Sequence, residues 1–480
     1  MRTRFAPSPT GYMHIGNLRT ALYCYLIAKH DNGKFILRIE DTDQNREVEG
    51  AIDMIYKVME DTGLGYDEGP DKPGDVGPYI QSERLSLYKE YADKLVDLGA
   101  AHYCFCDTET IEASKAEGNE EDGYIDPCKN LTIEEARERI KNGEPYCVRQ
   151  TIPSTGTTYF DDEIYGRIEV ENSGLSEGVL LKTDGYPTYN FANIIDDHLM
   201  GITHVVRGNE YLSSTPKYNL IYQAYGWDTP VYIHCPPVMK DEQHKLSKRN
   251  GDASYQDLIE KGYLNEAILN YIALLGWSPD GEEELFTLEE LKEVFDYKRI
   301  SKSGAIFDIN KLTWMNGMYL RKKSVDEFHE LCLPYYKDLD QSYDLHMISE
   351  LLQPRVEVLT EIPEKIDIFT KPYKFNVDMF NHKRQKTNPE NSLEALNWLL
   401  PELEALDDYS DVEKITNLMM DIAAKHEVKN GRVMYPATVA LTFKSPTPGG
   451  ASEIAHIIGK ENTINRIKDA INKLEEVVNG

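Results

Sequence analysis

The sequence lacks several features that would place it in a specialised class of protein. It has no run of about 20 apolar residues, which excludes an ordinary transmembrane helix. Its first residues, MRTRFAPSPTG, lack the apolar segment of a secretory signal, so we expect a cytoplasmic protein that does not contact a membrane. The seven cysteines are odd in number and unevenly spaced, which argues against a disulfide framework.

Two common catalytic motifs and an excess of basic charge are also missing. The absence of G-x-x-x-x-G-K-[ST] and H-E-x-x-H excludes an ordinary P-loop and a zincin site. The chain has 52 Lys and Arg against 82 Asp and Glu, which gives a formal net charge of −30. Nucleic acid repels such a protein as a whole, so any RNA contact must rest on local basic patches.

The patterning predicts an α/β fold followed by a helical half. Residues 2–9 are typical of a strand that ends in a turn, 17–30 of a helix, 35–40 of a buried strand and 47–63 of an amphipathic helix. This order favours a parallel sheet with crossover helices. Short strands and turns over 101–185 indicate an inserted subdomain, and from about residue 320 the pattern is helical almost throughout. At 480 residues, several domains are expected.

Two segments have the composition of a phosphate site. In PSPTGYMHIGN (7–17), prolines fix the backbone, Gly11 and Gly16 remove side chains, and His14 precedes a helix whose free N–H groups attract anions. Taken alone, this stretch is as consistent with a structural turn. The second segment, KLSKR (245–249), follows a strand-like stretch and ends in Asn-Gly, so its lysines can swing onto a polyphosphate. Alone, it would be a surface loop.

Together these segments resemble the HIGH and KMSKS elements of class I aminoacyl-tRNA synthetases. RFAPSPTG, RIEDTD, GPYIQSERLSLY, LLKTDGYPTYNFANIIDDHLMGITHVVRG and FDINKLTWMNGMYL are more specifically similar to bacterial-type glutamyl-tRNA synthetases. The resemblance covers almost the whole chain. It implies a Rossmann-like catalytic domain in two parts (1–100 and 186–250), an inserted acceptor-stem-binding subdomain (101–185), a stem-contact helical region (251–320) and an α-helical anticodon-binding domain (321–480).

The resemblance also implies a reaction: ATP, with Mg²⁺, and L-glutamate form glutamyl-adenylate, and the glutamyl group passes to the terminal adenosine of tRNA(Glu). His14, Lys245 and Lys248 match the catalytic residues, although Asn17 stands where HIGH has its second histidine. The expected ATP-binding residues are Pro9, Thr10, Gly11, His14, Gly16, Asn17, Glu210 and Lys248. The expected glutamate-binding residues are Arg4, Ala6, Ser8, Glu40, Tyr189, Asn193 and Arg207. Among these, a planar guanidinium suits the substrate carboxylates, and the acid Glu40 suits its α-ammonium.

The insertion carries a candidate zinc site. Cys104, Cys106 and Cys128 supply three thiolates, and Tyr124 stands at Y-x-x-x-C spacing. The family often has a C-x-C…C zinc site there, and a related family offers a Tyr precedent; reduced, buried cysteines are the alternative. Cys24, Cys147, Cys235 and Cys332 are interpreted as ordinary residues.

The helical half favours a glutamyl enzyme, because glutaminyl-tRNA synthetases use β-barrels to bind the anticodon. Arg355 matches an arginine that contacts the third anticodon base in members restricted to tRNA(Glu). We expect a monomer. Charging of tRNA(Gln) as well remains open, and so do two rival hypotheses: another class I activating enzyme, or an RNA-binding regulator that has lost activation.

Overall fold

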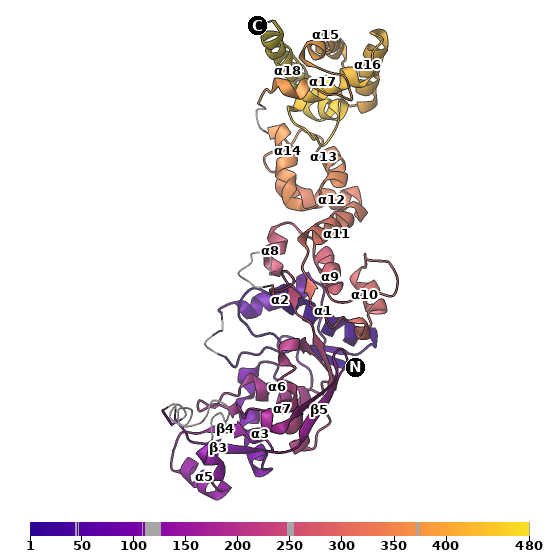
Figure 1. Ribbon diagram of the computed structural model, residues 1–480. Helices are drawn as coiled ribbons and strands as arrows, with labels where there is room; N and C mark the ends of the chain where they lie inside the picture. The colour runs from indigo at the N-terminus through magenta and orange to yellow at the C-terminus, as the bar shows by residue number, and fades with distance from the viewer. Residues whose placement is uncertain are drawn as a thin grey trace. The chain divides into compact units, whose positions relative to one another are not determined.

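A computed structural model describes residues 1–43, 46, 48–107, 109–110, 126–246, 254–370 and 374–479 (Figure 1). Its contacts divide the chain into two units, one of residues 1–260 and 265–309 and the other of residues 261–264 and 310–480. The first unit contains all the β-strands of the described residues, and the second is helical. No helix within the described residues is long and apolar enough to cross a membrane.

The first unit begins with the parallel pair that the sequence predicts. Strand β1 (Arg2–Phe5) pairs in parallel with β2 (Lys34–Leu37), and α1 (Ile15–His30) crosses between them. Helix α1 begins two residues before the expected position because His14 caps it: its Nδ1 accepts from the backbone N–H of Gly16 at 2.9 Å. Helix α2 (Ala51–Asp61) is shorter than expected because Gly50 has a left-handed backbone, with φ 76°.

The unit also contains a four-stranded sheet of order β6-β5-β9-β8, whose edge strand β8 lies next to β1. Its strands are β5 (Thr157–Asp162), β6 (Gly166–Glu171), β8 (His204–Gly208) and β9 (Val231–Cys235). Strand β9 is parallel to both β5 and β8, whereas β5 and β6 form an antiparallel hairpin. The hairpin at 157–171 therefore pairs with strands far along the chain, although it lies within the stretch expected to be the insertion.

A three-stranded antiparallel sheet, β3 (Ala101–Cys104), β4 (Cys147–Gln150) and β7 (Val179–Leu181), carries the cysteine segment. Helices α3 (Leu85–Asp97), α6 (Tyr189–Leu199) and α7 (Thr215–Tyr225) contribute buried side chains to one apolar core with this sheet. The unit also contains β10 (Val238–Met239) paired with β11 (Ala305–Ile306), and helices α5 (Ile133–Lys141), α8 (Tyr255–Glu260), α9 (Asn265–Ala273) and α10 (Leu288–Val294).

The second unit is helical, as the sequence predicts. Helix α11 (Ile309–Lys322) leads into it, followed by α12 (Val325–Cys332), α13 (Leu345–Leu352) and α14 (Ile362–Thr370). Helices α15 (Pro389–Ala405), α16 (Val412–Lys425) and α17 (Gly431–Thr442) pack with α18 (Ala451–Asn479), drawn from orange to yellow in Figure 1.

Candidate functional site

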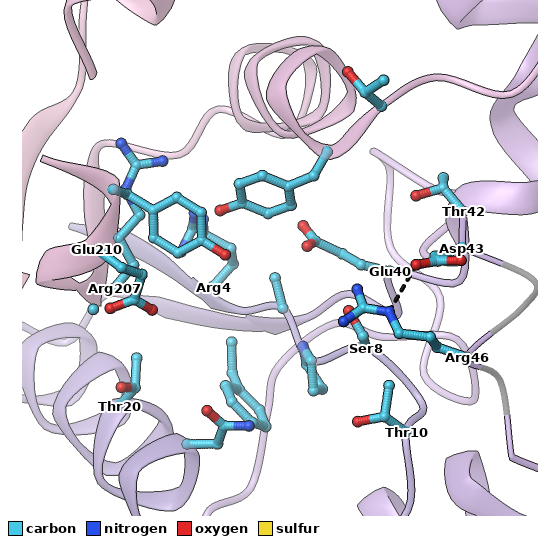
Figure 2. Close-up of a pocket in the computed structure, with 18 of the residues that line it drawn as sticks. Arg4, Ser8, Thr10, Thr20, Glu40, Thr42, Asp43, Arg46, Arg207 and Glu210 are labelled. Carbon is cyan, nitrogen blue, oxygen red and sulfur yellow. Dashed lines mark hydrogen bonds and ion pairs between the residues drawn. The ribbon is translucent and has the colours of Figure 1, made fainter. Parts of the chain in front are cut away.

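A pocket of about 740 Å³ opens where β1 and β8 reach their carboxyl ends (Figure 2). Ligands of open α/β sheets bind at such edges, because loops diverge there and helix N-termini face the opening. The pocket is lined by Arg4, Phe5, Ala6, Pro7, Ser8, Thr10, Asn17, Thr20, Glu40, Thr42, Asp43, Arg46, Lys182, Pro187, Thr188, Tyr189, Val206, Arg207, Gly208, Glu210 and Tyr211.

Buried charges of alternating sign support the pocket: Arg4 and Glu40 line it, whereas Arg38 and Asp197 do not. Asp197 Oδ1 accepts from Arg4 Nε at 2.9 Å and from Arg38 Nη1 at 2.8 Å, and Arg38 Nη2 donates to Glu40 Oε1 at 2.9 Å. Burial raises the pKa of Asp197, but the two arginines outweigh that effect and hold the pKa below its ordinary value. Arg4 and Arg38 are thereby neutralised and fixed.

Glu40 belongs to this network and, like Arg4, also lines the pocket. Burial raises the pKa of Glu40, and the neighbouring Arg38 and Arg4 oppose that rise. A cationic group that entered the pocket would therefore find a carboxylate with only one direct ion-pair partner among the described residues.

Asp196 and Asp197 both lie on helix α6. The carboxylate of Asp196 anchors this helix to residues 81–88. Its carboxylate accepts from Arg84 Nε at 2.7 Å, and from Gln81 Nε2 and the Tyr88 hydroxyl at 2.8 Å each. These contacts tie α6 to α3 and to the turn before it. Because α6 is held in this way, its first residue, Tyr189, has a fixed place in the pocket wall.

Arg207 is a buried cation of a different kind. It is only 5% exposed, yet no carboxylate of the described residues forms an ion pair with it. Its Cζ lies 5.1 Å from the ring centre of Tyr211, 4.9 Å from that of Tyr218 and 5.7 Å from that of Tyr232. These rings stabilise a cation without cancelling its charge. The pocket can therefore hold an anionic group at Arg207.

Six of the seven residues expected to bind glutamate line this pocket: Arg4, Ala6, Ser8, Glu40, Tyr189 and Arg207. Asn193 does not. It is buried one turn along α6, where its Nδ2 donates to the backbone carbonyl of Tyr189 at 2.5 Å. Tyr189 therefore lines the pocket, and Asn193 contacts Tyr189 from the side that faces away from the pocket.

The residues expected to bind ATP are divided between the pocket and the turn beside it. Thr10, Asn17 and Glu210 line the pocket, whereas Pro9, Gly11, His14 and Gly16 do not. Gly11 has φ 97°, and a Cβ on Gly16 would lie 3.1 Å from His14 Nδ1. The turn thus needs glycine at residue 11 for its backbone and at residue 16 for the histidine cap.

The second phosphate segment is described only in part. Lys245 is exposed and forms an isolated bridge with Met239, at the end of β10. Lys248 lies outside the residues that the structure describes. Its expected contact with ATP stays a prediction.

Sequence reasoning missed several polar residues of the pocket, notably Thr20, Thr42, Asp43, Arg46, Lys182 and Tyr211. Asp43 and Arg46 form an exposed ion pair of 2.7 Å, drawn as a dashed line in Figure 2. A signal existed for most of them, because Thr42 and Asp43 belong to RIEDTD, and Lys182 and Tyr211 stand within or beside the long segment that ends in VVRG.

Cys104, Cys106 and Cys128 lie together, as the sequence predicts for a metal site. Each offers one ligand atom, and these atoms lie within 4.8 Å of one another and of a carboxylate oxygen of Asp126. Three thiols and a carboxylate are a donor set that suits zinc. Tyr124, the expected fourth ligand, lies outside the described residues. Sequence reasoning missed Asp126, although it stands only two residues before Cys128.

Two residues around this cluster adjust its charge. Cys147 lies opposite Cys104 in the β3–β4 register, and its hydrogen bond lowers the pKa of Cys104 to about 6. His102 Nε2 lies 3.1 Å from Asp126 Oδ2. Burial raises the pKa of Asp126, but this contact and the hydrogen bonds from Cys104 and the backbone N–H of Cys128 together outweigh burial and lower the pKa. These contacts favour the thiolate of Cys104 and the carboxylate of Asp126, which are the forms that bind a cation.

A second pocket, of about 740 Å³, lies in the helical unit. Arg355 lines it, together with the basic residues Arg321, Lys365 and Lys444. Arg355 is held by a 2.6 Å hydrogen bond from its Nη1 to the carbonyl of Leu351. Three glutamates, Glu357, Glu361 and Glu364, line the same pocket, and Lys365 forms an ion pair with Glu361, so the lining carries only one more cation than carboxylates.

Comparisons with known proteins agree with both halves of the chain. Residues 1–314 match the family model "tRNA synthetases class I (E and Q), catalytic domain", and residues 327–471 match "Anticodon binding domain". The chain is 58% identical to glutamate–tRNA ligases of Clostridium botulinum (strain Hall) and Clostridium tetani. The first alignment covers 99% of both chains, and the second covers 100% of this chain and 99% of the relative.

Solved structures resemble the chain over the same length. A glutamate tRNA ligase from Elizabethkingia meningosepticum, crystallised in complex with its amino acid, matches with a TM-score of 0.89 and 33% identity, covering 99% of each chain. The glutamate-tRNA synthetase of Elizabethkingia anophelis matches with a TM-score of 0.87 and 33% identity, covering 98% of this chain and 99% of its own.

Proposed function

We propose that this chain, which belongs to the class I tRNA synthetases (E and Q), is a glutamate–tRNA ligase. It activates L-glutamate with ATP and transfers the glutamyl group to tRNA(Glu), releasing AMP and pyrophosphate. The observation that carries the proposal is Arg207, a buried arginine without a carboxylate partner among the described residues, in the same pocket as the acid Glu40. A substrate with a side-chain carboxylate and an α-ammonium complements these two charges.

The pocket orients glutamate through its three charged groups. Arg207 receives the side-chain carboxylate and Glu40 the α-ammonium. Arg4, whose Nε is used by Asp197, keeps other donors for a substrate oxygen. Ala6, Ser8 and Tyr189 shape the wall, and Asn193 supports Tyr189 from behind. Fixing all three groups places the α-carboxylate next to the turn where ATP binds.

ATP occupies the side of the pocket where Thr10 and Asn17 lie, next to the turn of residues 9–17. Thr10 and Asn17 in the pocket lining and the N–H groups at the start of α1 bind its phosphates, with His14 at the helix cap beside them, and Glu210 binds another part of the ATP. Lys245 and Lys248 neutralise the charge that grows on the phosphates during transfer. Mg²⁺ accompanies the ATP polyphosphate, as class I synthetases generally require.

The reaction needs no protein nucleophile. An oxygen of the glutamate α-carboxylate attacks the α-phosphorus of ATP, the bond to the β-phosphate breaks, and pyrophosphate leaves. A ribose hydroxyl of the terminal adenosine then attacks the activated carbonyl carbon, and AMP leaves. Positioning and charge stabilisation supply the catalysis.

Three parts of the chain serve the tRNA. The insertion at 101–185 contacts the acceptor stem, and residues 251–320 contact the stem further along. Arg355, which lines the pocket of the helical unit, binds the third anticodon base. An arginine can bind a base edge through two parallel hydrogen bonds, which makes it suited to this role. The helical anticodon half supports tRNA(Glu) as the main substrate.

The insertion holds one structural Zn²⁺. Cys104, Cys106 and Cys128 supply three ligands, and Asp126 or Tyr124 supplies the fourth; bound there, the ion would cross-link β3 to the segment around Cys128. Elemental analysis of the purified protein should find close to one zinc per chain. Fewer than one zinc per ten chains would leave the cysteines as ordinary buried thiols.

Charging of purified tRNA(Glu) and tRNA(Gln) with glutamate, side by side, tests the proposed function. We expect charging of tRNA(Glu), and the second arm decides whether tRNA(Gln) is also a substrate. ATP–pyrophosphate exchange with tRNA and glutamate present separates an active enzyme from a regulator, since a regulator gives none. We further propose a cytoplasmic monomer, which size-exclusion chromatography with light scattering checks.

A further inference from the structure

We propose that Asp162 and His234 are positioning residues that fix the guanidinium of Arg207 for an anionic amino-acid side chain. This inference rests on the proposed function, because it concerns how Arg207 meets the substrate carboxylate. Neither residue lines the pocket, so both act through Arg207.

The three residues stand on adjacent parallel strands. Arg207 on β8 is the direct register partner of His234 on β9, and Asp162 is the last residue of the neighbouring strand β5. All three are buried: His234 is 0% exposed, Asp162 3% and Arg207 5%. Buried polar side chains such as those of Asp162 and His234 would destabilise the protein unless they formed hydrogen bonds inside it.

Their hydrogen bonds define the tautomer of the histidine. Asp162 Oδ2 lies 2.6 Å from His234 Nδ1, and Asp162 Oδ1 accepts from the backbone N–H groups of Ile164 and Tyr165 at 2.9 Å each. An acceptor so placed requires the proton on Nδ1. Nε2 then has a free lone pair, which accepts from Arg207 Nε at 3.1 Å.

The histidine is neutral in this arrangement. Burial lowers the pKa of His234, and the Asp162 hydrogen bond opposes that shift only in part. A protonated ring would also direct a second N–H at the guanidinium, which can only donate.

A second neutral acceptor completes the support. Arg207 Nη2 donates to Thr215 Oγ1 at 3.0 Å, and that hydroxyl donates in turn to the Tyr211 carbonyl at 2.8 Å. Nε and Nη2 form one edge of the guanidinium, and this edge is now occupied. The other edge, formed by Nη1 and the second hydrogen of Nη2, can bind a carboxylate through two parallel hydrogen bonds.

The choice of a neutral acceptor matters for specificity. A carboxylate in direct contact with Arg207 would neutralise it and compete with the substrate. The imidazole holds the guanidinium in place while the negative charge of Asp162 stays one side chain further away. Arg207 is thereby fixed but still carries a charge for the ligand.

The substitution Asp162→Asn tests this arrangement. The amide can donate to Nδ1 and so move the proton of His234 to Nε2, which then points at Arg207 Nε–H. We expect the glutamate KM in ATP–pyrophosphate exchange to rise at least about tenfold, with the KM for ATP within twofold of wild type. Asp161→Asn is the matched control, because Asp161 is the preceding residue of β5 and its side chain is exposed. Equal glutamate KM values for the two variants would overturn the proposal.

A pair of histidine variants gives a second test that does not depend on Asp162. The carbonyl of a glutamine reaches the place of Nε2, whereas that of an asparagine reaches only the place of Nδ1. His234→Gln should keep the glutamate KM within about fivefold, and His234→Asn should raise it more than tenfold, at equal thermal stability. Equal KM values for the two variants would contradict the proposal.

The wild-type protein allows a direct measurement as well. Histidine ¹⁵N NMR at pH 7, with His234 assigned from the His234→Gln difference, should show a neutral ring protonated at Nδ1. Protonation at Nε2 would overturn the proposal even if the Asp162 variant does not fold. Exchange activity of the wild-type enzyme is measured first: its absence would refute the proposed function, whereas unchanged KM values in the variants would refute only this inference.

Discussion

The pocket contains two buried arginines whose surroundings are opposite in kind. Arg4 shares the carboxylate of Asp197 with Arg38, and the ion pair is 2.9 Å long with both side chains at least 96% buried. Arg207 is equally buried but is surrounded by three tyrosine rings, an imidazole and a hydroxyl, all of them neutral acceptors or π-systems. One cation is compensated within the protein, and the other is not.

This difference separates a cation that the protein itself compensates from one whose charge is left for the ligand. A buried ion pair adds little to stability by itself, but removal of one partner leaves the other charge unpaired and is costly. Arg207 has no carboxylate partner within the part of the chain that the structure describes, so the free energy of burying an unpaired charge already lowers the stability of the wild-type protein. Removal of this cation should therefore not destabilise the fold, although it abolishes binding of an anion. Substitutions on the two sides should therefore have opposite consequences for stability and activity.

The largest expected effect follows Arg207→Ala. Loss of two charge-assisted hydrogen bonds to the substrate carboxylate should lower kcat/KM for glutamate by about 10³-fold, because each is worth about 1.5–3 kcal/mol. The free energy of unfolding should stay the same or rise. Steady-state exchange kinetics and urea denaturation measure the two quantities. Unchanged glutamate affinity would refute the assignment. Arg207→Lys keeps the charge without the planar fork, so its loss should be intermediate.

Asp197→Asn addresses the compensated side. It leaves Arg4 and Arg38 buried without their shared carboxylate, so the free energy of unfolding should fall by about 3 kcal/mol. Urea denaturation checks this expectation. If the variant were as stable as wild type, the carboxylate of Asp197 would not be needed to compensate the two arginines, and the contrast with Arg207 would be lost.

The contribution of Asp197 to the free energy of unfolding should depend on pH. The pKa of Asp197 is lower in the folded protein than its unfolded value of about 3.9, because Arg4 and Arg38 favour the carboxylate. Its contribution is therefore complete above about pH 4 and is lost as the pH falls through the folded pKa. The stability difference between wild type and Asp197→Asn should shrink below pH 4. A difference that grows on acidification would contradict this account.

Arg355→Ala extends the comparison to the helical unit, with a smaller expected effect. Loss of one base contact costs about 1–3 kcal/mol, so KM for tRNA(Glu) should rise about tenfold or more. KM for glutamate should not change, because Arg355 lies in the other unit. Aminoacylation assays with varied tRNA measure both. A tRNA KM equal to that of wild type would make Arg355 an ordinary surface residue.

The smallest effect is expected for Arg46→Ala. Arg46 lines the same pocket as Arg4, but its side chain is 70% exposed and that of its partner Asp43 is 50% exposed. Water screens such a pair, so the free energy of unfolding should change by less than about 1 kcal/mol. A loss as large as that of Asp197→Asn would show that burial does not decide which pairs stabilise the fold.

Much of the site could be predicted from the sequence because its parts are local. The turn at residues 7–17 and helix α1 are fixed by prolines, glycines and helical periodicity within one short stretch. The pocket residues Arg4, Ser8 and Glu40 belong to contiguous motifs. Asp126 could have been added to the cysteine cluster from its spacing alone.

The residues behind the site could not be predicted in the same way. Asp197 is 193 positions from Arg4, and Asp162 is 72 positions from His234. In sequence they are single polar letters in buried elements, and only the pairing of β5, β9 and β8 shows what each one satisfies. Lys248 and Tyr124 stay predictions because they lie outside the described residues.

The central claim is that Arg207 is left uncompensated in order to bind a substrate carboxylate. Charging of tRNA(Glu) by the wild-type enzyme, with glutamate and with glutamine as the amino acid, tests it most directly. Glutamine is almost isosteric but neutral, so kcat/KM for glutamate should exceed that for glutamine by at least about 10³-fold. Values for the two amino acids within tenfold of each other would contradict the account.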